Sequence, residues 1–180
     1  MPATFVHLRL HSAFSLTEST LRIDTLTKLV SGDSQPAAAI TDTNNMFGAL
    51  EFAQSMAAAG VQPIMGTQIE LEDKAGRGDV VLLAQNETGY VNLSQLLSKI
   101  LLSSDTAQTP ACAVEDLAGY SDGLILLTGG ALTGFVGGPA GDRRANLAQQ
   151  RLESLAAIVR GRLYIELQRH GLPAEFAGEP

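Results

Sequence analysis

The sequence predicts an α/β fold, because short apolar runs typical of buried strands alternate with longer segments of helical periodicity. Strands that alternate with helices in this way predict parallel strands joined by crossover helices, in a barrel or an open sheet. At 180 residues, the chain has the length of one domain and can bury a sizeable core. The same pattern predicts each element in turn.

The first half of the chain is predicted to open with a strand over 5–11. Apolar and polar residues alternate there with a period of two, which puts His7, Arg9 and His11 on one face. Apolar residues at helical spacing predict two helices after this strand. Gly32 and Gly60 lie at the positions where these two helices are expected to end. The predicted elements of this half after the first strand are helices over 22–31 and 46–59 and extended segments over 37–41 and 61–71.

The second half repeats the alternation of strand and helix after a turn predicted at 74–78. Its strands are short and rich in Val, Leu and Ile, and its helices carry stripes of Leu and Ala. The predicted elements are strands over 79–85, 124–128 and 163–168, helices over 88–103 and 143–160, and a connector over 104–120 with one helical turn near 114–117.

Charge and cysteine content exclude several classes of function. The chain has 12 Lys and Arg residues and 19 Asp and Glu residues, which gives a formal charge of −7. Direct binding to nucleic acid is therefore not expected, because contacts to phosphate depend on Lys and Arg. The single cysteine, Cys112, excludes an intrachain disulfide and a cysteine-based zinc site. No secretory or membrane segment is visible, and a soluble, cytoplasmic protein is expected. Six of the basic residues are arginines in the last fifth of the chain; a solvated helix face explains them better than a docking surface for an acidic partner.

Polar side chains follow several predicted strands, which is where sites form in α/β folds. His7, Arg9 and His11 end the first strand, Asp42 follows the second, and His170 follows the last. Histidines and carboxylates gathered at one edge would suit a metal-dependent hydrolase. Arg9 argues against a metal, because its guanidinium offers no lone pair and repels a cation.

Two further candidate nucleophiles are better explained structurally. Ser12 and Ser15 lie near His11, but serines beside a strand end are more often caps or turn residues. Cys112 lies between two alanines with no cation nearby in the sequence, which predicts an inert thiol.

Ordered sequence blocks resemble the N-terminal PHP (polymerase and histidinol phosphatase) domain of bacterial DNA polymerase III alpha subunits. The blocks cover 5–16, 39–48, 60–66, 83–93, 123–130 and 164–171. The resemblance implies a distorted, TIM-like (β/α)7 barrel, of which residues 1–180 would hold the N-terminal two-thirds. The palm, thumb and fingers of the polymerase would follow residue 180, so no polymerase catalytic residue is carried over to this chain.

The resemblance also implies where a metal site would lie in metal-binding relatives. The corresponding positions here are His7, Arg9, His11, Glu18, Asp42, Thr43, Gln68, Asp79 and His170. Arg9, Thr43 and Asp79 stand in place of histidines, and Gln68 stands in place of a glutamate. A metal-free, non-catalytic site is therefore expected, with Arg9 as a structural surrogate for the lost cation, bridging Glu18, Asp42 or Glu166.

The function that the resemblance implies is a structural and subunit-docking module of a replicative DNA polymerase. The parent chain would carry out DNA-templated DNA synthesis, a nucleotidyl transfer, with Mg²⁺ in its polymerase domain. Implied partners are the rest of the polymerase chain, other replicase subunits including the proofreading exonuclease subunit, and DNA through the parent chain only. The alternative is a metal-dependent phosphoesterase or proofreading exonuclease of the PHP superfamily. A small-molecule binding module has only the fold in its favour.

Overall fold

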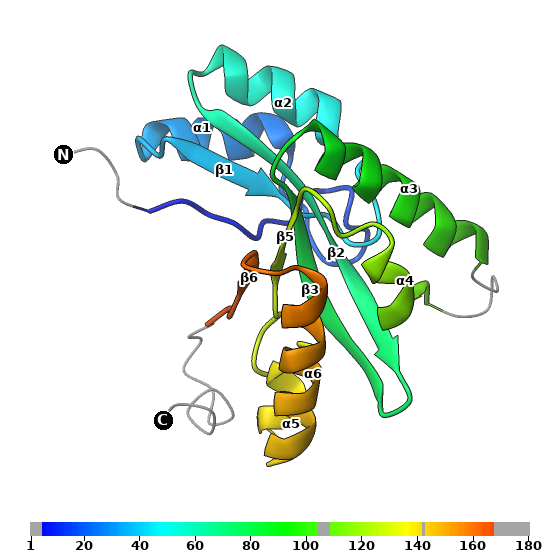
Figure 1. The fold of residues 1–180 in the computed structure, drawn as a ribbon. Helices are drawn as coiled ribbons and strands as arrows, with labels where there is room; N and C mark the ends of the chain where they lie inside the picture. The colour runs from blue at the N-terminus through cyan, green and yellow to red at the C-terminus, as the bar shows by residue number, and fades with distance from the viewer. Residues whose placement is uncertain (1–4, 104–108, 142, 168–180) are drawn as a thin grey trace. The chain divides into compact units, whose positions relative to one another are not determined.

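A computed structural model of the chain describes residues 5–103, 109–141 and 143–167 (Figure 1). The chain divides into two compact units, Met1–Gln68 and Ile69–Pro180, and each is described by itself. In the described residues no helix combines the length and the apolar character needed to cross a bilayer.

The first unit contains two helices and a parallel strand pair. Its elements are α1 (Ile23–Gly32), β1 (Ala37–Ile40), α2 (Ala49–Ala58) and the first part of β2 (Gln62–Asp73). β1 pairs with β2 in parallel, from Ala37 opposite Gln62 to Ile40 opposite Met65. α1 packs against α2 (Figure 1). Their inward faces and the strands bury one core cluster, formed by Ile23, Leu26, Val30, Ala38, Ile40, Phe52, Met56 and Val61.

The N-terminal segment is not the regular strand that its alternating sequence predicts. It runs beside β1 in parallel, and the backbone N–H groups of Ala39 and Thr41 donate to the carbonyls of His7 and Leu10, each at 2.8 Å. The N–H of Leu10 donates instead to the side-chain Oγ1 of Thr41, at 3.0 Å. The Thr41 hydroxyl thus accepts the hydrogen bond that a backbone carbonyl of β1 would accept in a regular parallel pairing. The described part of the N-terminal segment is therefore joined to β1 by one β-bridge, between His7 and Ala38.

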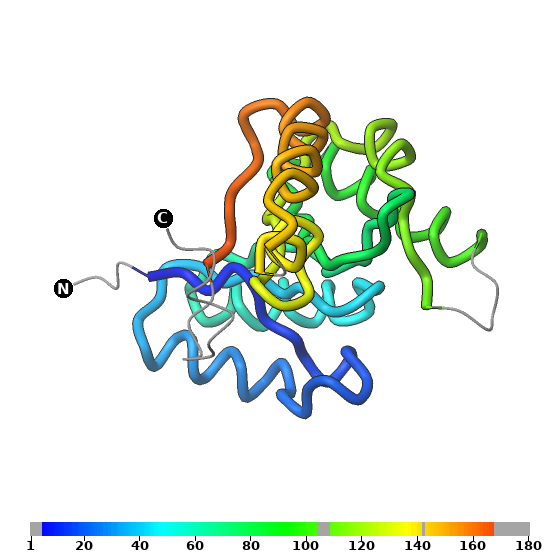
Figure 2. Tube along the Cα trace, turned by 90° about the horizontal axis from the view of Figure 1, so that it is seen from below, coloured from blue at the N-terminus to red at the C-terminus, as the bar shows by residue number. Residues whose placement is uncertain are grey.

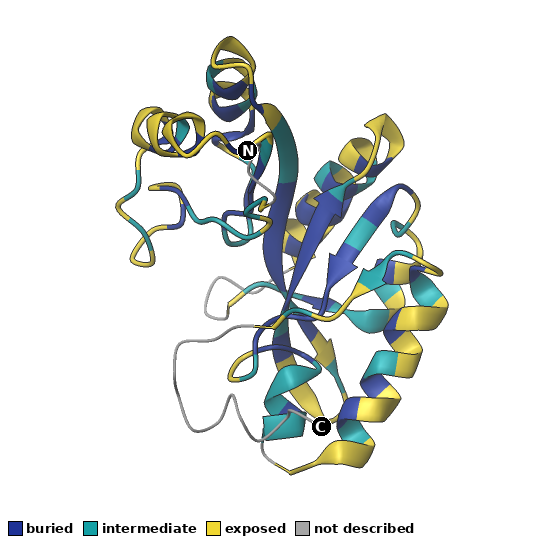
Figure 3. Ribbon diagram, turned by 90° about the vertical axis from the view of Figure 1, so that its left-hand side faces the viewer, coloured by how far each residue is buried: buried dark blue, intermediate teal, exposed yellow. Residues whose placement is uncertain are grey.

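Among its described residues, the second unit holds the end of β2 and eight further elements. They are β3 (Gly76–Ala84), α3 (Glu87–Ser103), β4 (Ala111–Ala113), α4 (Val114–Ala118), β5 (Leu124–Leu127), α5 (Gly137–Gly141), α6 (Ala145–Ile158) and β6 (Leu163–Tyr164). β2 pairs with β4, and β5 with β6, in parallel. The strands are largely buried, while the helices expose their outer faces (Figure 3). α5 lies beside α6 (Figure 2).

Parallel pairing is confirmed for β1 with β2, β2 with β4 and β5 with β6, but β3 pairs with β5 in the antiparallel sense. β2 and β3 are joined by a tight turn at Lys74 and Ala75, and a connection this short permits only a hairpin. The turn is shorter than the predicted 74–78, since β3 already begins at Gly76. β4 and α5 were not expected. β4 lies in the predicted connector, and α5 is built from the glycine-rich sequence GGPAG.

Candidate functional site

A buried carboxylate stands at the end of β1. Asp42 is 1% exposed, and both of its oxygens accept hydrogen bonds from the loop over 12–15. Oδ1 accepts from the Ser12 N–H and from the Ser15 hydroxyl, both at 2.6 Å, and Oδ2 accepts from the Ser12 hydroxyl at 2.7 Å. Hydrogen bonds to the charged form are what a buried carboxylate needs in place of water. The charge of Asp42 is therefore stabilised by donors of the chain itself.

A chain of polar side chains runs beside Asp42 and joins the N-terminal segment, the loop after β1 and the middle of β2. Arg9 Nη2 donates to Gln68 Oε1 at 2.6 Å, and the same oxygen lies 3.1 Å from His11 Nε2. The other ring nitrogen of His11, Nδ1, lies 3.0 Å from Glu18 Oε2. That carboxylate oxygen also accepts from the Thr43 hydroxyl at 2.7 Å. Gln68 Oε1 and Glu18 Oε2 are thus each shared between two neighbours.

Both ring nitrogens of His11 face oxygen acceptors. Arg9 can only donate, so it fixes Oε1 of the Gln68 amide on the His11 side. Glu18 presents a carboxylate oxygen to the other nitrogen. A metal ligand must offer a bare nitrogen, whereas each ring nitrogen of His11 lies at hydrogen-bonding distance from a side-chain oxygen. The ring is thus placed to join two acceptors.

The structure brings five of the predicted positions into direct contact: Arg9, His11, Glu18, Thr43 and Gln68. Asp42 lies next to them in the chain. His7 is not among these contacts; its ring lies edge-on against Phe5, with centroids 4.8 Å apart. Asp79 belongs to β3 in the second unit, where its backbone bonds to Thr133 and Phe135. His170 lies outside the described residues.

The residues of this cluster do not fit a metal ion. In the parts of the chain that the structure describes, no three His, Cys, Asp or Glu side chains are grouped so that they could share one. The chemistry of the cluster gives the reason, since a guanidinium and an amide occupy its centre and the Asp42 oxygens already accept three hydrogen bonds. Arg9 donates to the Gln68 amide, while Glu18 and Asp42 accept hydrogen bonds from Thr43 and from the two serines of the 12–15 loop. The bridging of a carboxylate by Arg9 stays a prediction.

Sequence reasoning missed the residues that hold this cluster together. The prediction that Ser12 is a turn residue is confirmed, because its hydroxyl accepts a hydrogen bond from the Phe14 N–H at 3.2 Å. The roles of Ser12 and Ser15 as donors to Asp42 were not foreseen. Asn45 was also missed: its Nδ2 donates to the carbonyls of Phe14 and Thr43, at 3.1 and 2.9 Å. The sequence does contain a signal for the serine donors, because an Asp that is buried after a strand requires hydrogen-bond donors from a nearby loop.

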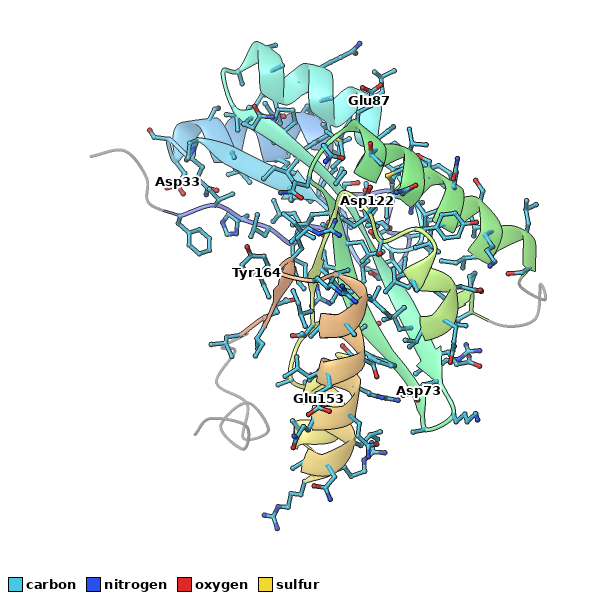
Figure 4. All side chains as sticks on the ribbon, in the orientation of Figure 1. Asp33, Asp73, Glu87, Asp122, Glu153 and Tyr164 are labelled. Atoms are coloured by element: carbon cyan, nitrogen blue, oxygen red, sulfur yellow. The ribbon has the colours of Figure 1, made fainter. Side chains whose placement is uncertain are left out.

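A second charged cluster, in the second unit, is structural. Arg151 on α6 is 4% exposed, and its Nε and Nη2 donate to the two oxygens of Asp73 at 2.8 and 2.7 Å. Further donations reach the carbonyls of Phe135 and Gly76, and the guanidinium lies 4.0 Å from the Phe135 ring centroid. Asp73 lies at the tip of the β2–β3 hairpin (Figure 4). One of the arginines expected on a solvated face is therefore buried.

Burial and neighbouring charges shift the pKa of several groups in the second unit. The hydrogen bond from Arg151 lowers the pKa of Asp73 below its usual value. Burial raises the pKa of Glu70, an effect that Arg77 partly offsets. Burial also raises the pKa of the Cys112 thiol to about 12, which confirms the prediction of an inert cysteine.

Comparison with known proteins places the chain among DNA polymerase sequences. The chain is 41% identical to DNA polymerase III subunit alpha of Caulobacter vibrioides over 98% of its length, and 35% identical to that of Thermus aquaticus over 95%. It is also 35% identical to an error-prone DNA polymerase of Symbiobacterium thermophilum. The chain spans only about one sixth of the length of these relatives, 15–17%.

Structure and family comparisons identify the fold. A crystal structure from Bifidobacterium adolescentis, of a protein proposed to be a metal-dependent phosphoesterase, superposes with a TM-score of 0.69. The match covers 98% of this chain and 82% of that one at 13% identity, so it shows the fold alone. The family model of the PHP domain matches residues 7–170, nearly the whole chain. The chain therefore belongs to the PHP domain family.

Proposed function

We propose that this chain is the N-terminal PHP region of a replicative DNA polymerase III alpha subunit. The observation that carries the proposal is the asymmetry of the matches, which cover 98% of this chain but only 16% of the Caulobacter vibrioides relative. In this proposal the remainder of a longer chain carries out DNA-templated nucleotidyl transfer, with Mg²⁺ in its own polymerase domain. DNA is contacted there and not by this acidic region, and the protein works in the cytoplasm.

The role proposed for residues 1–180 is structural and subunit-docking, without a metal. Three donors satisfy Asp42, and Arg9 with Gln68 and His11 occupies the position of the metal site that the family resemblance implies. Arg9 then acts as a fixed cation that compensates the carboxylates of the cluster, through the amide of Gln68. The partners are the rest of the polymerase chain and other replicase subunits, the proofreading exonuclease subunit among them.

The domain itself is proposed to continue beyond residue 180. Support comes from the apolar residues after β6, since Ile165 is 65% and Leu167 80% exposed. Strands of a parallel sheet are normally covered on both faces, and exposed apolar side chains at a sheet edge favour a further packing layer.

The test uses the full chain encoded by the gene, purified and supplied with a primed DNA template. Template-directed extension in the presence of Mg²⁺ is expected, together with a zinc and manganese content well below one per chain. A coding sequence that stops at residue 180, or a full chain without extension activity, would overturn the proposal.

The alternative, a metal-dependent phosphoesterase or proofreading exonuclease, is tested on the same preparation. A primer with a 3′ mismatch is offered with added Zn²⁺ or Mn²⁺. Hydrolysis that disappears in an Asp42→Asn variant, while extension is retained, would establish the alternative.

A further inference from the structure

Four large apolar side chains are exposed in the first unit, two on the loop after the N-terminal segment and two around the start of α2. Leu16 is 80% exposed, Phe47 74%, Leu50 70% and Phe14 38%. The Phe14 ring lies over Gly48, where an added Cβ would approach it to 2.9 Å. Phe47 lies just before α2, and Leu50 lies three residues later in the first turn of that helix. These four residues are called the Phe14 patch.

The loops that carry the Phe14 patch are braced by hydrogen bonds. Asn45 Nδ2 donates to the Phe14 carbonyl at 3.1 Å, and Asn45 Oδ1 accepts from the Phe47 N–H at 3.1 Å. The Ser15 hydroxyl accepts from the Thr43 N–H at 3.1 Å. Apolar side chains on loops fixed in this way lose little freedom on binding, which favours affinity. The bracing distinguishes the patch from isolated exposed leucines, which need no explanation.

A cavity of about 210 Å³ opens beside the Phe14 ring. It is lined by Ser12, Ala13, Phe14, Arg22, Ile23 and Glu51. A volume of this order holds one large apolar side chain, and buried anchors in such pockets dominate protein–protein binding.

The charges around the patch are mostly negative. At the cavity, Glu51 and Asp24 supply two carboxylates against the guanidinium of Arg22, which pairs with Asp24 at 3.4 Å. Glu51 makes no ion pair with any residue that the structure describes. An approaching segment with basic residues would be favoured at this rim.

From the braced apolar side chains, the cavity and the acidic rim, we infer that the Phe14 patch docks a protein partner. The partner presents one large apolar side chain for the cavity, with Lys or Arg next to it for Glu51. The inference rests on the proposed docking role of this region and assigns it to particular residues and to a basic, apolar-anchored segment.

The experiment places a photo-crosslinking phenylalanine at Leu50 in the full chain, in the cells that normally make it. The matched control carries the same group at Leu29, another leucine of the first unit that is 60% exposed but lies on α1 outside the patch. Cross-linked peptides are sequenced by mass spectrometry. The expected product, seen from Leu50 and not from Leu29, is a segment of another protein with a large apolar residue and a Lys or Arg within one helical turn.

Two substitutions test the physical basis of the product. Phe47→Ala and Glu51→Lys, each at an exposed position, should leave the melting temperature unchanged and together lower the cross-link yield about tenfold or more. The inference is overturned if Leu50 gives no more product than Leu29, or if the product is a second copy of this chain or an acidic segment. Primer extension by the same chain is measured in parallel, so that loss of extension counts against the proposed function and loss of the cross-link against the docking site.

Discussion

Replacing Asp42 by alanine should destabilise the protein more than any other single change in the candidate site. The carboxylate is 1% exposed and accepts three hydrogen bonds, so Asp42→Ala strands the Ser12 N–H and two hydroxyls that are themselves buried. Each hydrogen bond to a charged group contributes about 1.5–3 kcal/mol, but bonds to one carboxylate are not additive. Removal of one side of a buried charged contact costs about 3–5 kcal/mol, and that range is expected here.

The measurement is urea unfolding followed by circular dichroism, with the free energy of unfolding extrapolated to water. Asp42→Asn provides a milder version, because its remaining oxygen can keep the two bonds to Oδ1 while an NH₂ group faces the Ser12 hydroxyl. A loss of about 1–3 kcal/mol is expected for it. The control is Asp24→Ala, which removes an exposed partner of Arg22 and should cost less than about 1 kcal/mol. Equal losses for Asp42→Ala and Asp24→Ala would refute the reasoning.

Metal addition gives an independent check on the same preparation. A ligand at a hundred times its dissociation constant stabilises the folded state by about 2.7 kcal/mol. No such rise is expected with Zn²⁺ or Mn²⁺, because the Asp42 oxygens are already occupied by donors of the chain. A rise of this size that Asp42→Asn abolishes would show that the carboxylate binds metal after all.

Three further predictions concern other charged and polar groups. Arg9→Ala should lower the melting temperature clearly and Arg9→Gln less, because an amide can still donate to Gln68; equal melting temperatures for wild type and Arg9→Ala would exclude the charge-surrogate role. The pKa of Asp73 is lowered in the folded state, so the ionised carboxylate contributes its full stabilisation above pH 3.8, the usual pKa of Asp, and loses it as the pH falls below that value. In Asp73→Asn, the free energy of unfolding should therefore fall less steeply with decreasing pH in the acid range. Cys112, with its pKa raised to about 12, should react with a thiol reagent at neutral pH roughly a thousand times more slowly in the folded protein than in urea, and equal rates would contradict its burial.

Most elements could be predicted from the sequence because their local patterns agree with their final environment. The helix predicted over 88–103 is α3 at Glu87–Ser103, since its leucine stripe decides both periodicity and burial. The strand predicted over 124–128 is β5 at Leu124–Leu127 for the same reason. The direction of β3 could not be predicted in this way, because it depends on the length of one turn rather than on the strand's own residues.

The candidate site was predictable in its membership but not in its bonding. Arg9, His11 and Gln68 could be placed together through the resemblance to the PHP domain, because Gln68 lies within β2 and no strand end marks it in the sequence. The hydrogen-bond partner of each side chain in the cluster depends on the conformation of the loops that carry it. One such loop contains Asn44 in the αL conformation, with φ 55°. The serines of the 12–15 loop became partners of Asp42 through that geometry, and no periodicity in the sequence encodes it.

The ion pair between Arg151 and Asp73 also bears on the order of folding events. It joins residues 78 positions apart, linking α6 to the tip of a hairpin that can form locally. Contacts of such sequence separation carry a high loop-closure cost and tend to form late. Arg151→Met should therefore speed unfolding while leaving the refolding rate nearly unchanged, which places this buried pair after the rate-limiting barrier. The Arg151–Asp73 ion pair would then lengthen the lifetime of the folded state. Stopped-flow measurements of the refolding and unfolding rates test this directly.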